Sequence, residues 1–192
     1  MKFTREGLLT LLIVVAALFV GSRVVQLIPS SDEQFGRPFE HHAAVGEATE
    51  IRTGTVKVTG FDSAVEIEGH GAVAASTALF LVVDFEWLAK DQPHLFSVTE
   101  IVLQAADGRR FGGPAPVVAA CLPGQPHIKL ACQAPFEVPA DALEGATLRM
   151  PAATHTERDD VVIVDLGIDA ARAAELAKPK DRIKMTGAVE LP

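Results

Sequence analysis

The chain holds two cysteines, and their spacing favours a structural disulfide. The segment between Cys121 and Cys132 contains Pro123-Gly124-Gln125-Pro126, which can turn the chain back so that the two sulfur atoms meet. Closing a loop of this size stabilises a folded domain by about 3 kcal/mol, because the unfolded chain loses entropy. Two alternatives fit less well: a redox pair usually has Cys-x-x-Cys spacing, and a zinc site needs two further ligands at short spacing.

The histidines give no metal-ligand pattern. They fall in predicted loops or in the segment after the N-terminal run, at His41, His42, His70, His94, His127 and His155. Adjacent residues on a strand point to opposite faces, so His41 and His42 do not converge on one ion. His155 lies near Asp159 and Asp160, and such a loop either binds a cation or is an ordinary acidic surface loop. We favour the surface loop and expect solvated histidines and no bound metal.

No catalytic motif is present in the sequence. The Gly-x-Ser-x-Gly and Ser-x-x-Lys signatures of Ser nucleophiles are absent, and no Gly-rich loop opens a helix to bind phosphate. Asp84 and Glu86 share one face of a predicted strand at a separation of about 7 Å, which is also found between glycosidase carboxylates. Such residues more commonly form the outward, polar face of a sheet. We therefore predict no catalytic residue, no cofactor and no enzymatic activity.

The segment 7–28 has the length and apolarity of a membrane-spanning helix. Residues 7–22 carry no charge. A helix over the whole segment rises about 33 Å, enough to cross a hydrocarbon core of about 30 Å. Arg23 lies near the outer end, where its side chain can reach the headgroups. The predicted anchor residues are Gly7, Leu12, Val15, Phe19 and Ile28.

Charges on either side of this segment predict its orientation. Lys2 and Arg5 precede it, whereas Asp32 and Glu33 follow it, so the positive-inside rule places the N-terminus in the cytoplasm. A cleaved signal peptide is the alternative, but the apolar character continues beyond a usual h-region and lacks a good small-residue cleavage site. We predict an uncleaved signal-anchor in the plasma membrane, a single pass, and an extracytoplasmic C-terminal domain.

Beyond the anchor, alternating apolar and polar residues predict β-strands separated by turns. In the strongest strand, the side chains of Leu81, Val83, Phe85 and Trp87 point one way, toward a core. Asp107-Gly108 is a hairpin signal between two further strands. About seven or eight such strands predict an all-β fold, an antiparallel β-sandwich. The predicted divisions are a cytoplasmic N-terminus (1–6), the transmembrane signal-anchor (7–28), a tether (29–48), the sandwich (49–168) and a short helix with a C-terminal extension (169–192).

The C-terminal segment combines a predicted helix with a basic run. Asp169 is a suitable N-cap for a short Ala-rich helix over 170–177, which Pro179 ends. The basic residues that follow are Lys178, Lys180, Arg182 and Lys184. They either form a loosely docked, solvated tail or contact anionic lipid or a partner. Because residues 24–192 hold 14 basic against 24 acidic residues, nucleic-acid binding is not expected.

The strand pattern resembles that of a known group of domains. The segments that carry the likeness are Leu81-Val82-Val83-Asp84-Phe85, Asp107-Gly108-Arg109-Arg110-Phe111, Phe136-Glu137-Val138-Pro139 and Val164-Asp165-Leu166. They resemble the small extracytoplasmic immunoglobulin-like domains of bacteria, including secreted mycobacterial immunogenic antigens and their membrane-anchored relatives of unknown function. The resemblance covers residues 50–168, and it implies an immunoglobulin-like sandwich without established catalysis. It supplies no functional residues, and neither the cysteine pair nor the helix after Asp169 belongs to it.

Three functions are compatible with these features. In the first, which we favour, the sandwich is a non-catalytic, protein-binding or accessory module of the cell envelope that contacts another envelope or membrane protein. In the second, the chain is an accessory subunit of a larger membrane complex and docks through its transmembrane helix. In the third, it carries a lipid or another small ligand, which requires a large apolar cavity. In each case the N-terminal helix contacts membrane lipid.

Overall fold

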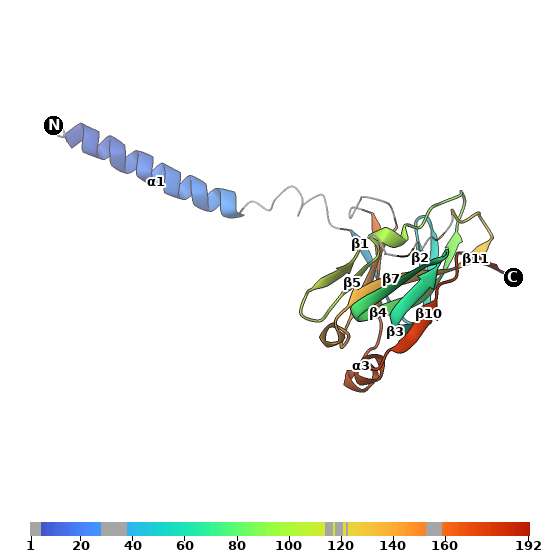
Figure 1. Ribbon diagram of the computed structural model, residues 1–192. Helices are drawn as coiled ribbons and strands as arrows, with labels where there is room; N and C mark the ends of the chain where they lie inside the picture. The colour runs from blue at the N-terminus through green and yellow to red at the C-terminus, as the bar shows by residue number, and fades with distance from the viewer. Residues whose placement is uncertain (1–4, 28–37, 114–116, 118–120, 122, 153–158) are drawn as a thin grey trace. The chain divides into compact units, whose positions relative to one another are not determined.

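The chain divides into two units, Met1–Arg37 and Pro38–Pro192. A computed structural model describes residues 5–27, 38–113, 117, 121, 123–152 and 159–192 (Figure 1). The first unit contains a helix and the second contains all the described strands, so each unit is considered by itself.

The first unit is formed by one helix, α1 (Arg5–Leu27). Its sequence is rich in Leu and Val and lacks Pro, so no residue in it removes a backbone hydrogen bond of the helix. Its described large apolar side chains are exposed; Leu18 is 70% exposed and Phe19 is 64% exposed. These side chains therefore have no protein core around them.

The membrane span predicted for residues 7–28 coincides with α1 over most of its length. The predicted anchor residues that the structure describes are exposed, at Gly7, Val15 and Phe19. Ile28 and the side chain of Leu12 lie outside the described residues. Among the parts of the chain that the structure describes, no helix has both the length and the apolarity needed to cross a membrane.

The second unit is built from two β-sheets. Sheet A contains, in spatial order, β1 (Phe39–Ala44), β9 (Asp160–Asp165), β8 (Thr147–Pro151), β5 (Val102–Gln104) and β6 (Arg110–Gly112). Sheet B contains β10 (Lys180–Lys184), β3 (Gly54–Gly69), β4 (Ala72–Ala89), β7 (Lys129–Val138) and β11 (Val189–Leu191), and β2 (Ala48–Ile51) also pairs with β3. The described helical elements of this unit are two 3₁₀ turns, Val98–Glu100 and Ala140–Ala142, and α3 (Ala170–Leu176).

This arrangement confirms the predicted β-sandwich, with one correction. The chain passes from sheet B to sheet A after β4, returns for β7 and crosses again for β8 and β10. Most neighbouring strands are antiparallel, but β1 with β9 and β10 with β3 are parallel. The prediction of a wholly antiparallel sandwich is therefore wrong at these pairs. Strands joined by long stretches of chain are free to run in the same direction, and here both parallel pairs involve a strand near one end of the domain.

The predicted tether, 29–48, ends earlier than expected. Residues Phe39–Ala44 form β1 and pair with β9, and Ala48 begins β2. The side chain of Ala43 packs against the core, and Arg149 on β8 lies 3.2 Å from the Glu40 carboxylate. The alternation that predicts a strand is weak in β1, because its half-buried residues are His41 and Ala43 and its exposed residues include the apolar Phe39. Residues 29–37 lie outside the described residues.

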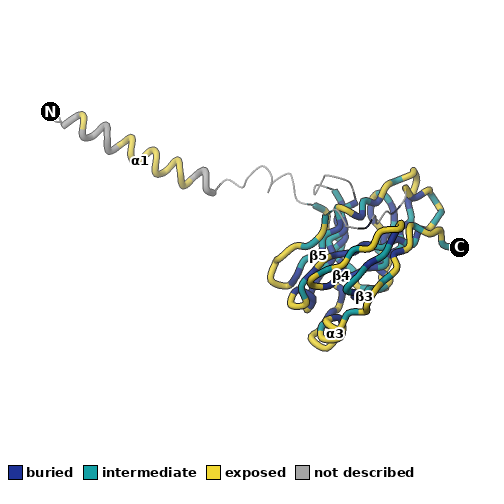
Figure 2. The backbone as a smooth tube through the Cα atoms, in the orientation of Figure 1, coloured by how far each residue is buried: buried dark blue, intermediate teal, exposed yellow. Residues whose placement is uncertain are grey.

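The core lies between the two sheets (Figure 2). Leu81, Val83, Phe85 and Trp87 are all buried, which confirms the direction predicted for β4. Phe96, from the loop after β4, packs against two of these rings, with centroid distances of 5.7 Å to Phe85 and 4.9 Å to Trp87. The assignment of Trp87 to the core is therefore confirmed.

The predicted hairpin at Asp107-Gly108 is also present, between β5 and β6. The carboxylate of Asp107 accepts a hydrogen bond of 3.0 Å from the backbone N–H of Arg109. Gly108 has a φ of +88°, a conformation that glycine adopts without steric cost.

The C-terminal segment is part of the sheet rather than loosely docked. As predicted, Asp169 caps a short helix: its carboxylate accepts from the backbone N–H of Arg172 at the start of α3. The Ser63 hydroxyl donates to the Leu176 carbonyl oxygen at 2.7 Å and holds the end of α3 against β3. Beyond α3, β10 pairs with β3 and β11 pairs with β7. Between these strands, the Met185 side chain is buried in a second apolar cluster, so the segment contributes to the fold.

Candidate functional site

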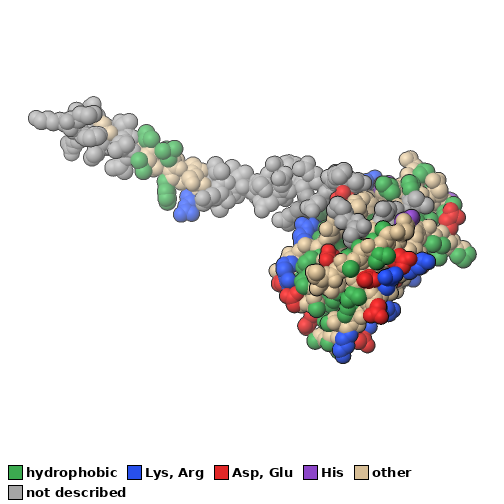
Figure 3. Space-filling model, in the orientation of Figure 1, with side chains coloured by type: hydrophobic (Ala, Val, Ile, Leu, Met, Phe, Trp, Pro, Cys, Tyr) green, Lys and Arg blue, Asp and Glu red, His purple; other side chains and the backbone are tan. Residues whose placement is uncertain are grey.

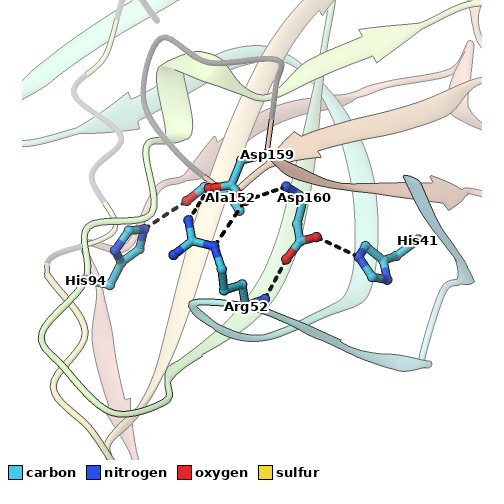
Figure 4. A network of polar contacts seen from close by, with 6 residues as sticks. All are labelled: His41, Arg52, His94, Ala152, Asp159 and Asp160. Atoms are coloured by element: carbon cyan, nitrogen blue, oxygen red, sulfur yellow. Dashed lines mark hydrogen bonds and ion pairs between the residues drawn. The ribbon is translucent and has the colours of Figure 1, made fainter. Parts of the chain in front are cut away.

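One end of the sandwich gathers polar residues from distant parts of the sequence (Figure 4). His41 lies on β1, Arg52 in the turn between β2 and β3, and His94 in the loop after β4. Asp159 and Asp160 lie at the start of β9, and Ala152 follows β8. We call these six residues the end network, and hydrogen bonds connect the strands that carry them.

Asp160 is the central residue of the end network. Its side chain is 12% exposed. His41 Nε2 donates to Asp160 Oδ1 at 3.0 Å, and the backbone N–H of Arg52 donates to Oδ2 at 2.6 Å. Both oxygens of this nearly buried carboxylate therefore have a partner, and they connect β9 to β1 and to the turn after β2.

Asp159 and Arg52 form an ion pair beside Asp160. Arg52 Nε donates to Asp159 Oδ1 at 3.2 Å, and Nη2 donates to Oδ2. Asp159 Oδ1 also accepts from the backbone N–H of Asp160 at 2.9 Å. The hydrogen bond from Arg52 lowers the pKa of the Asp159 carboxyl; partial burial acts against this, and the Asp160 N–H adds to it. Asp159 therefore stays ionised, and its charge is balanced by Arg52.

His94 connects the end network to the aromatic core. Its Nε2 lies 2.8 Å from the Ala152 carbonyl oxygen. Because a carbonyl oxygen only accepts, Nε2 carries the proton. The His94 carbonyl oxygen accepts from Trp87 Nε1 at 3.3 Å, and the Ala152 N–H donates to the Asp160 carbonyl oxygen at 2.8 Å. A continuous set of contacts therefore runs from Trp87 to Asp160.

Two large apolar side chains protrude at this same end. Phe39, the first residue of β1, is 69% exposed, and its N–H donates to the Asp159 carbonyl oxygen at 3.2 Å. Leu95 follows His94 directly in the sequence and is 49% exposed. The end network thus combines satisfied polar groups with an exposed aromatic ring and an exposed aliphatic side chain.

The contacts of the end network join strands of the domain to one another. The His41–Asp160 pair has the contacts of a His–carboxylate dyad, but none of the six residues of the network is a Ser, Thr or Cys that His41 could activate. Among the described residues, no three of the His, Cys, Asp and Glu side chains are grouped so that they could hold a metal ion. His155, which the sequence placed near Asp159 and Asp160, lies outside the described residues. The two aspartates were expected in an ordinary surface loop, but they join three strands.

The predicted disulfide is present. Cys121 and Cys132 are bonded, with their Cα atoms 5.3 Å apart, and both residues are buried. The loop that the bond closes contains Gly124, which exchanges two backbone hydrogen bonds with His94, of 3.0 and 2.9 Å. The disulfide therefore holds the loop that packs over Trp87 and His94.

The carboxylates of Asp84 and Glu86 face outward from sheet B and are both engaged. Gln133 Nε2 donates to Asp84 Oδ1 at 2.8 Å, and Lys129 Nζ lies 3.4 Å from Glu86 Oε2. Two open hollows adjoin these residues on the outer surface of the sheet, with volumes of about 270 and 260 Å³. Thr186 forms part of the wall of the larger hollow, and its N–H donates to Gln133. The carboxylates of Asp84 and Glu86 are therefore part of a polar sheet surface, and neighbouring side chains hold them in place.

The basic run at the C-terminus is partly neutralised within the domain. Lys180 pairs with Asp62, while Arg182 contacts Glu66 at 2.7 Å and Glu68 at 3.1 Å. Lys178 and Lys184 are exposed. The mixed colours over this part of sheet B in Figure 3 show the same interleaving of basic and acidic side chains. Only part of the run is therefore left to attract an anionic surface.

Comparisons with known proteins give a likeness of fold at most. No protein-family model and no curated protein matches the sequence. Among solved structures, the yjhA protein of Bacillus subtilis is similar, with a TM-score of 0.47 and 13% identity, over 65% of this chain and 99% of that one. An uncharacterized β-sandwich protein of Clostridium difficile 630 is similar with a TM-score of 0.44 and 8% identity, over 72% of this chain and 99% of that one. Both scores are below 0.5, so neither likeness bears on what this protein does.

Proposed function

We propose that this protein is a non-catalytic, membrane-tethered module of the bacterial cell envelope. Its extracytoplasmic sandwich, of the immunoglobulin-like kind, contacts another envelope or membrane protein. The observation that carries the proposal is α1, in which large apolar side chains such as Leu18 and Phe19 are more than half exposed. Apolar side chains on this scale need a non-aqueous environment, and the uncharged run 7–22 of the sequence suits a bilayer.

The disulfide supports an extracytoplasmic position for the sandwich. Disulfides form and persist in oxidising compartments and are rare in the cytosol. The Cys121–Cys132 bond is buried at the loop that covers Trp87, and an extracytoplasmic compartment would preserve it. Lys2 and Arg5, which precede the apolar segment 7–28, and the acidic residues that follow it give the matching orientation.

The balanced polar groups of the sandwich favour binding over catalysis. The conspicuous carboxylates, on Asp84, Glu86, Asp159 and Asp160, each contact a donor within the domain. A rigid sandwich of this kind presents its contacts at loops and ends. The two hollows described on sheet B are open to solvent, and their linings mix apolar side chains with charged ones such as Glu86 and Lys129, whereas a lipid carrier needs an enclosed apolar cavity.

Three experiments test this proposal. After alkaline extraction of isolated membranes, the protein should remain in the membrane pellet. In intact spheroplasts, protease added from outside should remove a tag placed at the C-terminus. Recovery of the protein in the soluble fraction would contradict the anchor. Photo-crosslinking from the loops in intact membranes should then yield one reproducible partner, whereas a collection of abundant, unrelated neighbours would contradict a binding role.

A matched variant separates binding through the sandwich from docking through the helix. Replacing residues 7–28 with an unrelated membrane-spanning sequence should preserve the crosslinked partner if the sandwich makes the contact. Loss of the partner in this variant would favour the accessory-subunit alternative, in which α1 itself packs into a membrane complex.

A further inference from the structure

The end of the sandwich that carries the end network is also where the chain enters the domain. Phe39 begins β1, and residues 28–38 separate it from the end of α1. A chain of eleven residues spans at most about 40 Å even when fully extended. If α1 lies in a bilayer, as proposed above, the Phe39 end of the domain cannot move farther than this from the membrane.

Two strongly exposed large apolar side chains lie at this end. Outside α1, the described large apolar residues that are strongly exposed are Phe39, Val73, Leu95 and Val189. Phe39 and Leu95 both flank the end network: Phe39 donates to the Asp159 carbonyl oxygen, and Leu95 follows His94, which donates to the Ala152 carbonyl oxygen. Val73 lies near the start of β4. The residue of that strand close to this end is its last one, Ala89, so Val73 lies at the opposite end of the strand.

Three carboxylates at this end each contact a nitrogen donor, which lowers their repulsion from an anionic lipid surface. Arg52 is bonded to Asp159, and Lys90 Nζ lies 2.6 Å from Glu50 Oε1. Asp160, the other carboxylate of the network, is nearly buried and bonded to His41. The outer domain is acidic as a whole, and these contacts reduce the negative charge that its described residues present at this end.

We propose that this end of the sandwich rests on the membrane interface, with the side chains of Phe39 and Leu95 inserted among the lipid headgroups. The proposal rests on the membrane anchor of the previous subsection and adds the contact that orients the domain. Apolar side chains on a membrane-bound surface typically enter the boundary between headgroups and acyl chains by about 5–10 Å. The contact through Phe39 and Leu95 gives the sandwich a defined orientation on the lipid surface.

The test uses tryptophan fluorescence of the full-length protein reconstituted in vesicles. The vesicles contain phosphatidylcholine brominated in its acyl chains, which quenches indoles that touch it, with a minor fraction of phosphatidylglycerol. Phe39→Trp and Leu95→Trp place reporters at the proposed contact, and Val73→Trp is the matched control. Val73 has nearly the same exposure as Leu95, at 52%, but is separated from Ala89 by roughly 50 Å of strand. The native Trp87 is buried and gives the unquenched background.

We expect several-fold stronger quenching at positions 39 and 95 than at position 73, and little change when salt is raised. Quenching that disappears with salt would instead indicate attraction of charges to the headgroups and would overturn insertion. Equal quenching at all three positions, or none at 39 and 95 in protein that floats with the vesicles, would also overturn the inference while leaving the anchor intact. Failure of the parent protein to float with the vesicles would overturn the anchor and this inference together.

Discussion

His41 and Asp160 are 119 positions apart in the sequence, and their side chains form a hydrogen bond of 3.0 Å. Asp160 is nearly buried, while His41 belongs to the first strand of the domain, at the edge of sheet A. The bond joins the point where the chain enters the sandwich to strand β9. The entry strand is thereby fixed by a side-chain contact as well as by its backbone ladder.

Replacing His41 should loosen this connection. We expect His41→Ala to lower the free energy of unfolding by about 1–2 kcal/mol, because Asp160 loses a charge-assisted partner in a poorly solvated position. The measurement is urea denaturation of the oxidised domain. His42→Ala is the matched control, since the neighbouring histidine has a side chain that is 73% exposed, and its effect should stay within about 0.5 kcal/mol. Equal effects of the two substitutions would contradict the assigned role of His41.

Gly124 should be required for the packing of Trp87. A Cβ atom at Gly124 would lie 2.7 Å from Trp87 Nε1, closer than non-bonded atoms approach. Gly124→Ala should therefore destabilise the domain by about 1–3 kcal/mol through overpacking. Thermal unfolding, followed by Trp87 fluorescence, measures the change. Gly60→Ala is the control, because a Cβ there meets no atom within 4 Å; a loss equal to that of Gly124→Ala would contradict this explanation.

The disulfide should stabilise the oxidised domain. Removing the Cys121–Cys132 bond by reduction, or by replacing both residues with Ala, should cost about 3 kcal/mol, because the unfolded chain regains the entropy of the open loop. Denaturation curves with and without reductant measure this difference. A double Cys→Ala variant that unfolds at the same denaturant concentration as the parent in the absence of reductant would show that the loop is held by other contacts.

Acid should weaken the end network through Asp159. The pKa of this carboxyl is lowered in the folded state, so its contribution to stability is present above the unfolded pKa and is lost as pH falls through the folded pKa. Since an unperturbed Asp titrates near pH 3.9, the loss should occur below about pH 4. The free energy of unfolding, measured against pH, should fall less steeply at acid pH in Asp159→Asn than in the parent protein.

A second substitution identifies the cause of this pH dependence. Arg52→Met removes the guanidinium whose hydrogen bond is the principal cause of the lowered Asp159 pKa. It should remove most of the same pH dependence, because the Asp160 N–H still lowers the pKa of Asp159, and adding Arg52→Met to Asp159→Asn should produce little further change. Additive effects of the two substitutions would show that they act on separate groups.

The β-sandwich and much of its core could be predicted from local patterns. Leu81, Val83, Phe85 and Trp87 alternate with polar residues, and burial on one side of a pleated strand requires that alternation. Asp107 and Gly108 form the hairpin turn that their residue types predict, and Asp169 caps the helix that follows it. Cys121 and Cys132 were paired from their spacing and the turn residues between them. In each case the determining residues lie close together in the chain.

The end network could not be predicted in this way. His41, Arg52 and Asp160 meet only after β1 has paired with β9 and the turn after β2 has folded against them, and no local pattern carries the register of a parallel pair. The C-terminal strands were also missed, because charged side chains dominate β10 and its partners Asp62, Glu66 and Glu68 belong to a distant strand.

The sequence by itself therefore determined which segments are apolar, which alternate, where the chain turns and which two cysteines join. All of these follow from interactions among residues within a few positions of one another. Only the tertiary structure decided that residues 39–48 belong to the sandwich, that Asp159 and Asp160 hold three strands together, and that Phe39 and Leu95 protrude at the same end. Those outcomes depend on strand order and register, which are set by the packing of the whole domain.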